Sequence, residues 1–139
     1  MNLETFELAH RAVTCKHWKW IPGMMIHNAD GFVRIDGGVD GEPFVYGRCQ
    51  WSGERIELFV RENPLPDLSD PATVGCLLDL VRKAWHTAPA NVNCHMSYSP
   101  NKGHYRNWTC SYCTGESWNQ TIGETEVEVL VLALEASNG

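Results

Sequence analysis

Three segments of the chain repeat apolar residues at intervals of three and four positions, the spacing that predicts amphipathic helices. The first runs from Leu3 to Thr14, the second lies within LPDLSDPATVGCLLDLVRKAW, and the third runs from Glu126 to Ala136. Asp70 is the predicted N-cap of the second helix. Thr125 and Glu128 have the spacing of a capping box, which predicts the start of the third.

The first helix has a predicted buried stripe made of Leu3, Phe6, Ala9, His10 and Val13. His10 lies within this stripe. We therefore expect it to be a core residue with its hydrogen bonds satisfied, and neither a ligand nor a catalytic base.

Between the helices lie short runs of strand-forming residues bounded by turn residues. Seven strands are expected, at Trp20–His27, Gly31–Asp36, Phe44–Gly47, Glu57–Arg61, Val92–Tyr98, Tyr105–Tyr112 and Ser117–Ile122. The short stretch NAD between the first two suits a hairpin loop. Helices separated by hairpins indicate an α+β fold, an antiparallel sheet covered by three helices in a single domain over residues 1–139.

The composition of the 139 residues is that of a soluble globular protein, since 43% of them are hydrophobic and 20% are charged. No apolar run approaches the roughly 18 residues of a membrane span, and the first residues lack the basic start of a secretory signal. We therefore expect a cytoplasmic protein with reduced cysteines and no membrane partner. The net charge of −6 argues against a nucleic-acid polymer as partner. Residues 80–114 contain bases but no acid, however, and such a local positive field can hold a small anion.

The second and third helices also carry a family resemblance. DPATVGCLLDLVRKAW, followed by IGETEVEVLVLALEA, resembles helices of small phage and prophage proteins, and the opening FELAHRAVTCKHWKWIPGMM is similar to their start. The layout is similar to the phage α-β-α sandwich domain family. This resemblance implies a central sheet with helices on both faces and a protein that works in the cytoplasm of an infected host cell.

Motifs that carry enzyme chemistry are missing from the sequence. It contains no G-x-S-x-G elbow, no P-loop, no H-E-x-x-H pair and no G-x-G-x-x-G after a strand. We therefore expect a protein without catalytic activity and without a cofactor.

The pair Cys110 and Cys113 could be half of a zinc site, since zinc needs about four ligands. Cys94 or His95, together with His104, could complete such a site. Residues three apart on a continuous strand point to opposite faces, so chelation requires Cys113 to lie beyond the strand, in a turn. The alternative is that these thiols pack as small hydrophobic residues.

Nucleotide binding is the remaining hypothesis, because bases stack on aromatic rings and arginine forks match phosphate oxygens. HYRNW and RCQWSGER combine both residue types, and Arg61 closes the following strand. The candidate ligand-binding residues are Trp51, Arg55, Arg61, Tyr105, Arg106 and Trp108. The alternative is that the tryptophans are core residues and the arginines lie at its rim.

Some phage proteins that resemble this plan are oligomeric sponges, which sequester cyclic nucleotide signals without converting them. The resemblance thus implies a counter-defence protein, a homo-oligomer that binds a small anionic nucleotide. A second hypothesis is a protein that blocks a host protein through its acidic C-terminal helix, with Glu126 and Glu135 in the contact. A third is a small zinc-stabilised module.

Overall fold

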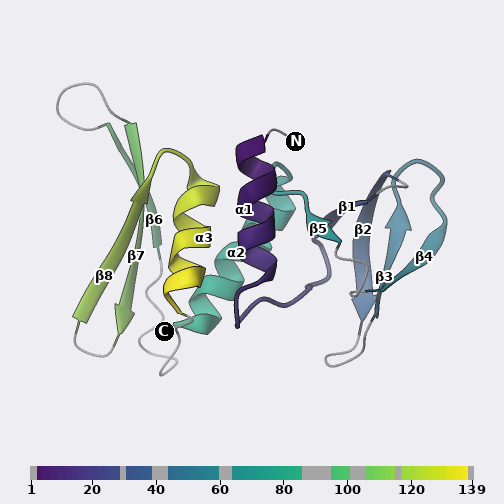
Figure 1. Cartoon of the computed structure of the whole chain (residues 1–139), viewed down its shortest axis with the longest axis horizontal. Helices are drawn as coiled ribbons and strands as arrows, with labels where there is room; N and C mark the ends of the chain where they lie inside the picture. Colours follow the sequence, from purple (N-terminus) through teal and green to yellow (C-terminus); the bar gives the residue numbers. More distant parts are fainter. Residues whose placement is uncertain are drawn as a thin grey trace. The chain divides into compact units, whose positions relative to one another are not determined.

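The computed structural model describes residues 3–28, 31–38, 44–59, 64–85, 95–100, 106–114 and 117–137 (Figure 1). These residues form three helices and eight strands. The helices are α1 (Leu3–Val13), α2 (Pro71–Ala84) and α3 (Glu126–Ala136). The strands are β1 (Met25–Asn28), β2 (Gly31–Gly38), β3 (Phe44–Cys49), β4 (Arg55–Phe59), β5 (Leu65–Pro66), β6 (His95–Pro100), β7 (Arg106–Thr114) and β8 (Ser117–Gly123).

The predicted α+β class is confirmed, and every strand pair is antiparallel. The strands form two sheets, with the orders β4-β3-β2-β1-β5 and β6-β7-β8. The chain groups into two compact units, whose boundary within α2 follows Cys76. None of the described helices is both long and apolar enough to cross a membrane.

The first unit contains α1 and the five-stranded sheet. Side chains alternate between the faces of a strand, and here one face is apolar and buried. Its buried residues are Ile26, Val33, Ile35, Val45 and Leu58.

Gly47 lies on this buried face, where β2 and β3 approach closely. A Cβ atom built there would lie 2.6 Å from the backbone oxygen of Arg34 and from a methyl group of Val33. Only glycine fits at this position without a shift of the neighbouring strand.

The start of α2 is fixed to this sheet by a network of polar groups. The Arg34 guanidinium donates to both carboxylate oxygens of Asp70, at 3.0 and 3.1 Å. Asp70 is the predicted N-cap, and it accepts hydrogen bonds from the backbone N–H of Thr73 at 3.0 Å and from its hydroxyl at 2.8 Å. The buried Thr73 hydroxyl in turn accepts from the backbone N–H of Met25. One carboxylate thus caps the helix and joins it to β1 and β2.

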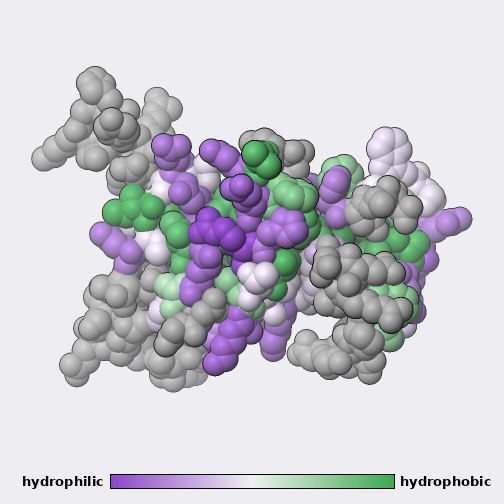
Figure 2. Space-filling model, in the orientation of Figure 1, coloured by the Kyte–Doolittle hydropathy of each residue, from purple (hydrophilic) through white to green (hydrophobic). Residues whose placement is uncertain are grey.

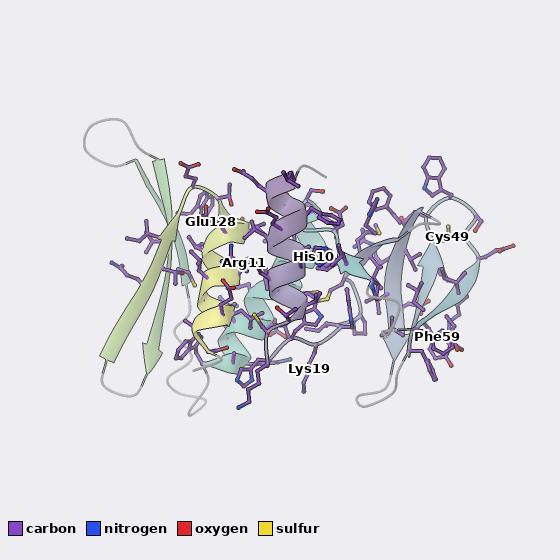
Figure 3. The ribbon with its side chains drawn as sticks, viewed as in Figure 1. His10, Arg11, Lys19, Cys49, Phe59 and Glu128 are labelled. Atoms are coloured by element: carbon purple, nitrogen blue, oxygen red, sulfur yellow. The ribbon has the colours of Figure 1, made fainter. Side chains whose placement is uncertain are left out.

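The predicted buried stripe of α1 is confirmed at Ala9 and wrong at its larger residues. Leu3 and Phe6 are exposed by 74% and 41%, and His10 is exposed as well. The two fully buried residues of the helix are small, Ala9 from the predicted stripe and Ala12 beside it. The small alanine side chains allow α1 to pack closely against the rest of the protein. The larger side chains of Leu3 and Phe6 are exposed to solvent. The Phe6 and His10 rings pack on each other, 4.7 Å apart, and Figure 3 shows His10 projecting from α1.

The second unit contains the three-stranded sheet, α3 and the rest of α2. α3 packs on β7 and β8 and buries Val129, Leu130, Val131, Ala133 and Leu134. The indole N–H of Trp85, just after α2, donates to the backbone oxygen of Ala133 at 2.9 Å. This bond joins the end of α2 to α3.

The first turn of α3 confirms one half of the predicted capping box. The Thr125 hydroxyl accepts a hydrogen bond from the backbone N–H of Glu128. The Glu128 carboxylate bonds the backbone N–H of Glu124 instead of that of Thr125. It lies against Gly123, where a Cβ atom would be 2.9 Å from it. Figure 3 labels Glu128 at this end of α3.

Candidate functional site

The face of the five-stranded sheet opposite the buried one carries arginines and aromatic rings. On β3 these are Phe44, Tyr46 and Arg48, and on β4 they are Arg55 and Phe59. The two arginines are exposed and the three rings are half-buried. Glu57 of β4 lies on the same face, opposite Tyr46, and is exposed. We call these six residues, together with Asp36 of β2, the arginine–aromatic face. In Figure 2, hydrophobic and hydrophilic residues lie next to each other where β3 and β4 are seen in Figure 1.

The aromatic residues of this face form a connected group. The Phe44 ring meets Tyr46 edge to face with centroids 5.2 Å apart, and Phe59 with centroids 6.2 Å apart. The Arg55 guanidinium lies over the Tyr46 ring, 4.8 Å from its centroid. Figure 3 labels Phe59 in this part of the sheet. The face thus has both an apolar, π-rich part and a cationic part.

Three arginines lie in one row across the sheet. Arg34 of β2 pairs with Arg48 of β3, and Arg48 pairs with Arg55 of β4. Like charges directly opposite each other destabilise a sheet. Arg34 is compensated by Asp70, which raises the pKa of Arg34 and has its own pKa lowered through their hydrogen bond. Arg48 and Arg55 remain as a neighbouring cationic pair.

Asp36 is the carboxylate that these two arginines share. It lies 3.8 Å from Arg48 and 3.6 Å from Arg55. The pairing of β2 with β3 shifts register between Ile35 and Gly37, which makes Asp36 the extra residue of a bulge. A bulge re-aims side chains. Both ion pairs are long and exposed, and such pairs contribute little stability.

Of the residues predicted for ligand binding, Arg55 and Trp51 lie in the first unit. Arg55 belongs to the arginine–aromatic face. Trp51 lies in the turn after β3 and is 82% exposed, with its ring against Gly31. Arg61 and Tyr105 lie outside the described residues.

The other two predicted residues lie in the second unit, on β7. Arg106 is the first residue of that strand and pairs with Pro100. Trp108 is half-buried, and strand alternation places it on the same face of β7 as the fully buried Cys110. Trp108 therefore has the surroundings of a residue at the edge of the core.

The zinc hypothesis required Cys113 to lie beyond the strand. β7 instead continues through Cys113 to Thr114, with Cys110 opposite Thr121 and Cys113 opposite Trp118. Cys110 is a buried thiol outside any disulfide. Cys94 and His104 lie outside the described residues. In the part of the chain that is described, no three metal-ligating side chains gather.

The acidic helix of the protein-blocking hypothesis is largely enclosed. Glu126 and Glu135 are half-buried, and Glu128 is engaged in the cap. Comparison with known proteins adds no further indication, since no family model, no curated protein and no solved structure matches this chain.

Sequence reasoning missed Asp36, Tyr46, Phe44 and Phe59 as site residues. A signal for the rings was present, because FVYGR and RIELF alternate the residue types of this face with apolar ones. The bulge that directs Asp36 toward the arginines has no such signal.

Proposed function

We propose that the protein binds a small anionic nucleotide on the arginine–aromatic face and sequesters it without converting it. The observation that carries the proposal is the row of Arg34, Arg48 and Arg55, of which two share a single distant carboxylate. Like charges opposite each other on neighbouring strands lower the stability of the sheet at that place. Such local departures from stable design are typical of functional sites.

The chemistry of the face fits the two parts of a nucleotide. A cyclic dinucleotide or trinucleotide carries at least two phosphodiester charges against the single charge of Asp36, and its phosphate oxygens can meet both guanidinium groups, so it can displace Asp36 from Arg48 and Arg55. The neighbouring rings of Tyr46, Phe44 and Phe59 offer surface for a base, since every base has a π-face that packs on aromatic residues.

Sequestration rather than turnover is part of the proposal, and the composition of this face supports it. It combines cations, rings and the carboxylates of Asp36 and Glu57, and none of its residues is a serine, cysteine, histidine or lysine nucleophile. The resemblance of the helices to phage proteins suggests the biological setting, a counter-defence protein that removes a cyclic nucleotide signal in the host cytoplasm.

Native mass spectrometry of the purified protein with cyclic dinucleotides, cyclic trinucleotides and cyclic ADP-ribose tests this proposal. We expect one class to bind and to be released chemically intact on heating. Arg48→Gln and Arg55→Gln should each weaken binding about tenfold or more, because each removes a charged hydrogen-bond donor.

Lys83→Gln is the matched control. It removes the same charge from α2, where Lys83 pairs with Asp79, and should leave affinity unchanged. A protein that binds none of these ligands, or binds one equally well without Arg48 and Arg55, would refute the proposal. A failure to bind would favour the hypothesis of a host protein partner.

A further inference from the structure

The sheet surface that carries the arginine–aromatic face continues onto β1 and β2. Phe32 lies two residues before Arg34 on β2, where β2 pairs with β1 without a register shift, so strand alternation places both side chains on one face. His27 is the partner of Phe32 on β1, and their rings pack with centroids 5.0 Å apart. Phe32 is half-buried and His27 is exposed. We call these two residues the ring pair.

Aromatic rings therefore flank the row of arginines on both sides. The backbone N–H of Gln50 donates to the backbone oxygen of Phe32 at 2.9 Å, so the ring pair lies beside the far end of β3, beyond Arg48. Tyr46 and the rings that contact it lie on the other side of Arg48. Tyr46 and Gln50 are four residues apart, which on a strand is about 13 Å. The row of arginines runs midway between the two groups of rings.

Arg48 and Arg55 are directed toward different groups of rings. The Arg55 guanidinium lies over the Tyr46 ring. The Arg48 guanidinium donates to the backbone oxygen of Gly53 at 3.1 Å. Gly53 belongs to the turn after β3, on the side of the arginine row where Phe32 lies. A guanidinium has five N–H donors, so both arginines can still bond phosphate oxygens. The surface thus consists of two units, each with one arginine and one group of rings.

We infer that the ligand of this surface is a cyclic dinucleotide, with one base on the ring pair and the other on the rings around Tyr46. The inference rests on the proposed function and names the class of nucleotide. Each base of a nucleotide is joined to its phosphate through one ribose, so one base and one phosphate suit one group of rings and one arginine. Every base has a π-face that stacks on aromatic rings, and two phosphodiester charges match Arg48 and Arg55.

The other nucleotide classes fit this arrangement less well. A ligand with a single base, such as a cyclic mononucleotide or cyclic ADP-ribose, leaves one of the two groups of rings without a base. A cyclic trinucleotide has a third base, and the described residues of this surface include no third group of rings. The two-sided arrangement therefore selects for two bases.

Titration calorimetry with cyclic di-AMP, cyclic di-GMP, cyclic AMP and cyclic GMP tests the inference. One of the dinucleotides should bind at least about tenfold more tightly than its mononucleotide, because it stacks two bases instead of one. Phe32→Leu keeps an apolar side chain that can pack on the sheet but removes the π-face. It should weaken the dinucleotide about fivefold or more. Phe6→Leu is the matched control, since Phe6 also packs on a histidine ring, but in α1, and should leave the affinity unchanged.

His27→Ala is a second variant, at an exposed position, in case circular dichroism shows that Phe32→Leu is unfolded. It should also weaken the dinucleotide, and His10→Ala is its control in α1. A single-base ligand or a cyclic trinucleotide that binds as tightly as the dinucleotides, and loses affinity in Arg48→Gln, overturns the inference but leaves the proposed function in place. So does a dinucleotide whose affinity is unchanged in the folded variants of the ring pair. If no nucleotide binds, the inference and the proposed function both fail.

Discussion

Asp36 competes, in the proposed mode of binding, with the ligand for Arg48 and Arg55. A nucleotide phosphate can use both guanidinium groups fully only when it displaces this carboxylate. We therefore predict that Asp36→Asn raises nucleotide affinity roughly two- to tenfold, because exposed ion pairs of this kind are each worth about 0.2 to 1 kcal/mol. Isothermal titration calorimetry with the ligand found by mass spectrometry measures this change.

Glu7→Gln serves as the control for Asp36→Asn. It removes one negative charge from an exposed position of α1 and should change affinity much less. Equal affinity gains in both variants would mean that only the overall charge matters. A loss of affinity in Asp36→Asn would mean that Asp36 itself contacts the ligand, and that the phosphate does not replace it.

At the scale of single residues, the sequence predicted only part of the arginine–aromatic face. The strands predicted at Phe44–Gly47 and Glu57–Arg61 each omit two residues at the turn, and these omitted ends contain Arg48 and Arg55. The alternation that would place both arginines beside Tyr46 was therefore not extended to them. Asp36 depends on a bulge, which arises from the pairing of two strands and has no local sequence signature.

At the scale of elements, the start of α2 depends on one carboxylate, and this makes its stability sensitive to pH. The hydrogen bonds from Arg34 hold the pKa of Asp70 below its ordinary value of 3.8. Because the folded-state pKa is lower than the unfolded one, the ionised carboxylate stabilises the fold above about pH 3.8. That contribution is lost as the pH falls through the folded-state pKa.

Asp70→Asn isolates this contribution, because asparagine is also a good N-cap residue but carries no charge for Arg34. We predict that at pH 7 the variant has a free energy of unfolding lower by about 1 to 3 kcal/mol. The difference from wild type should shrink as the pH is lowered below 4. Urea unfolding of both proteins at neutral and acidic pH measures it. A difference that is constant with pH would contradict an ionic role for Asp70.

The helices also show which elements a sequence predicts well. α3 has its predicted bounds, because its cap is local in sequence and its apolar residues are numerous enough to be buried on most sides. The buried side of α1 was predicted wrongly, since Leu3 and Phe6 suggested a stripe that the helix does not use. The periodicity did predict that Ala9 is buried, but it missed Ala12, whose burial depends on close tertiary packing that hydrophobic periodicity alone does not reveal. β5 has two residues, and it exists only through its pairing with β1.

At the scale of the whole molecule, salt should weaken the proposed nucleotide binding. This binding joins a multiply charged anion to two exposed arginines of a chain whose net charge is −6, so it depends on a local attraction. The Debye length falls from about 10 Å at 0.1 M salt to about 3 Å at 1 M. The affinity for the nucleotide should therefore fall as the salt concentration rises.

Dissociation constants for the nucleotide, measured by titration calorimetry at low and at high sodium chloride, test this prediction. A nucleotide affinity that is insensitive to salt would mean that the bases, and not the phosphates, provide most of the binding free energy. In that case Tyr46, Phe44 and Phe59, rather than Arg48 and Arg55, would be the residues to substitute next.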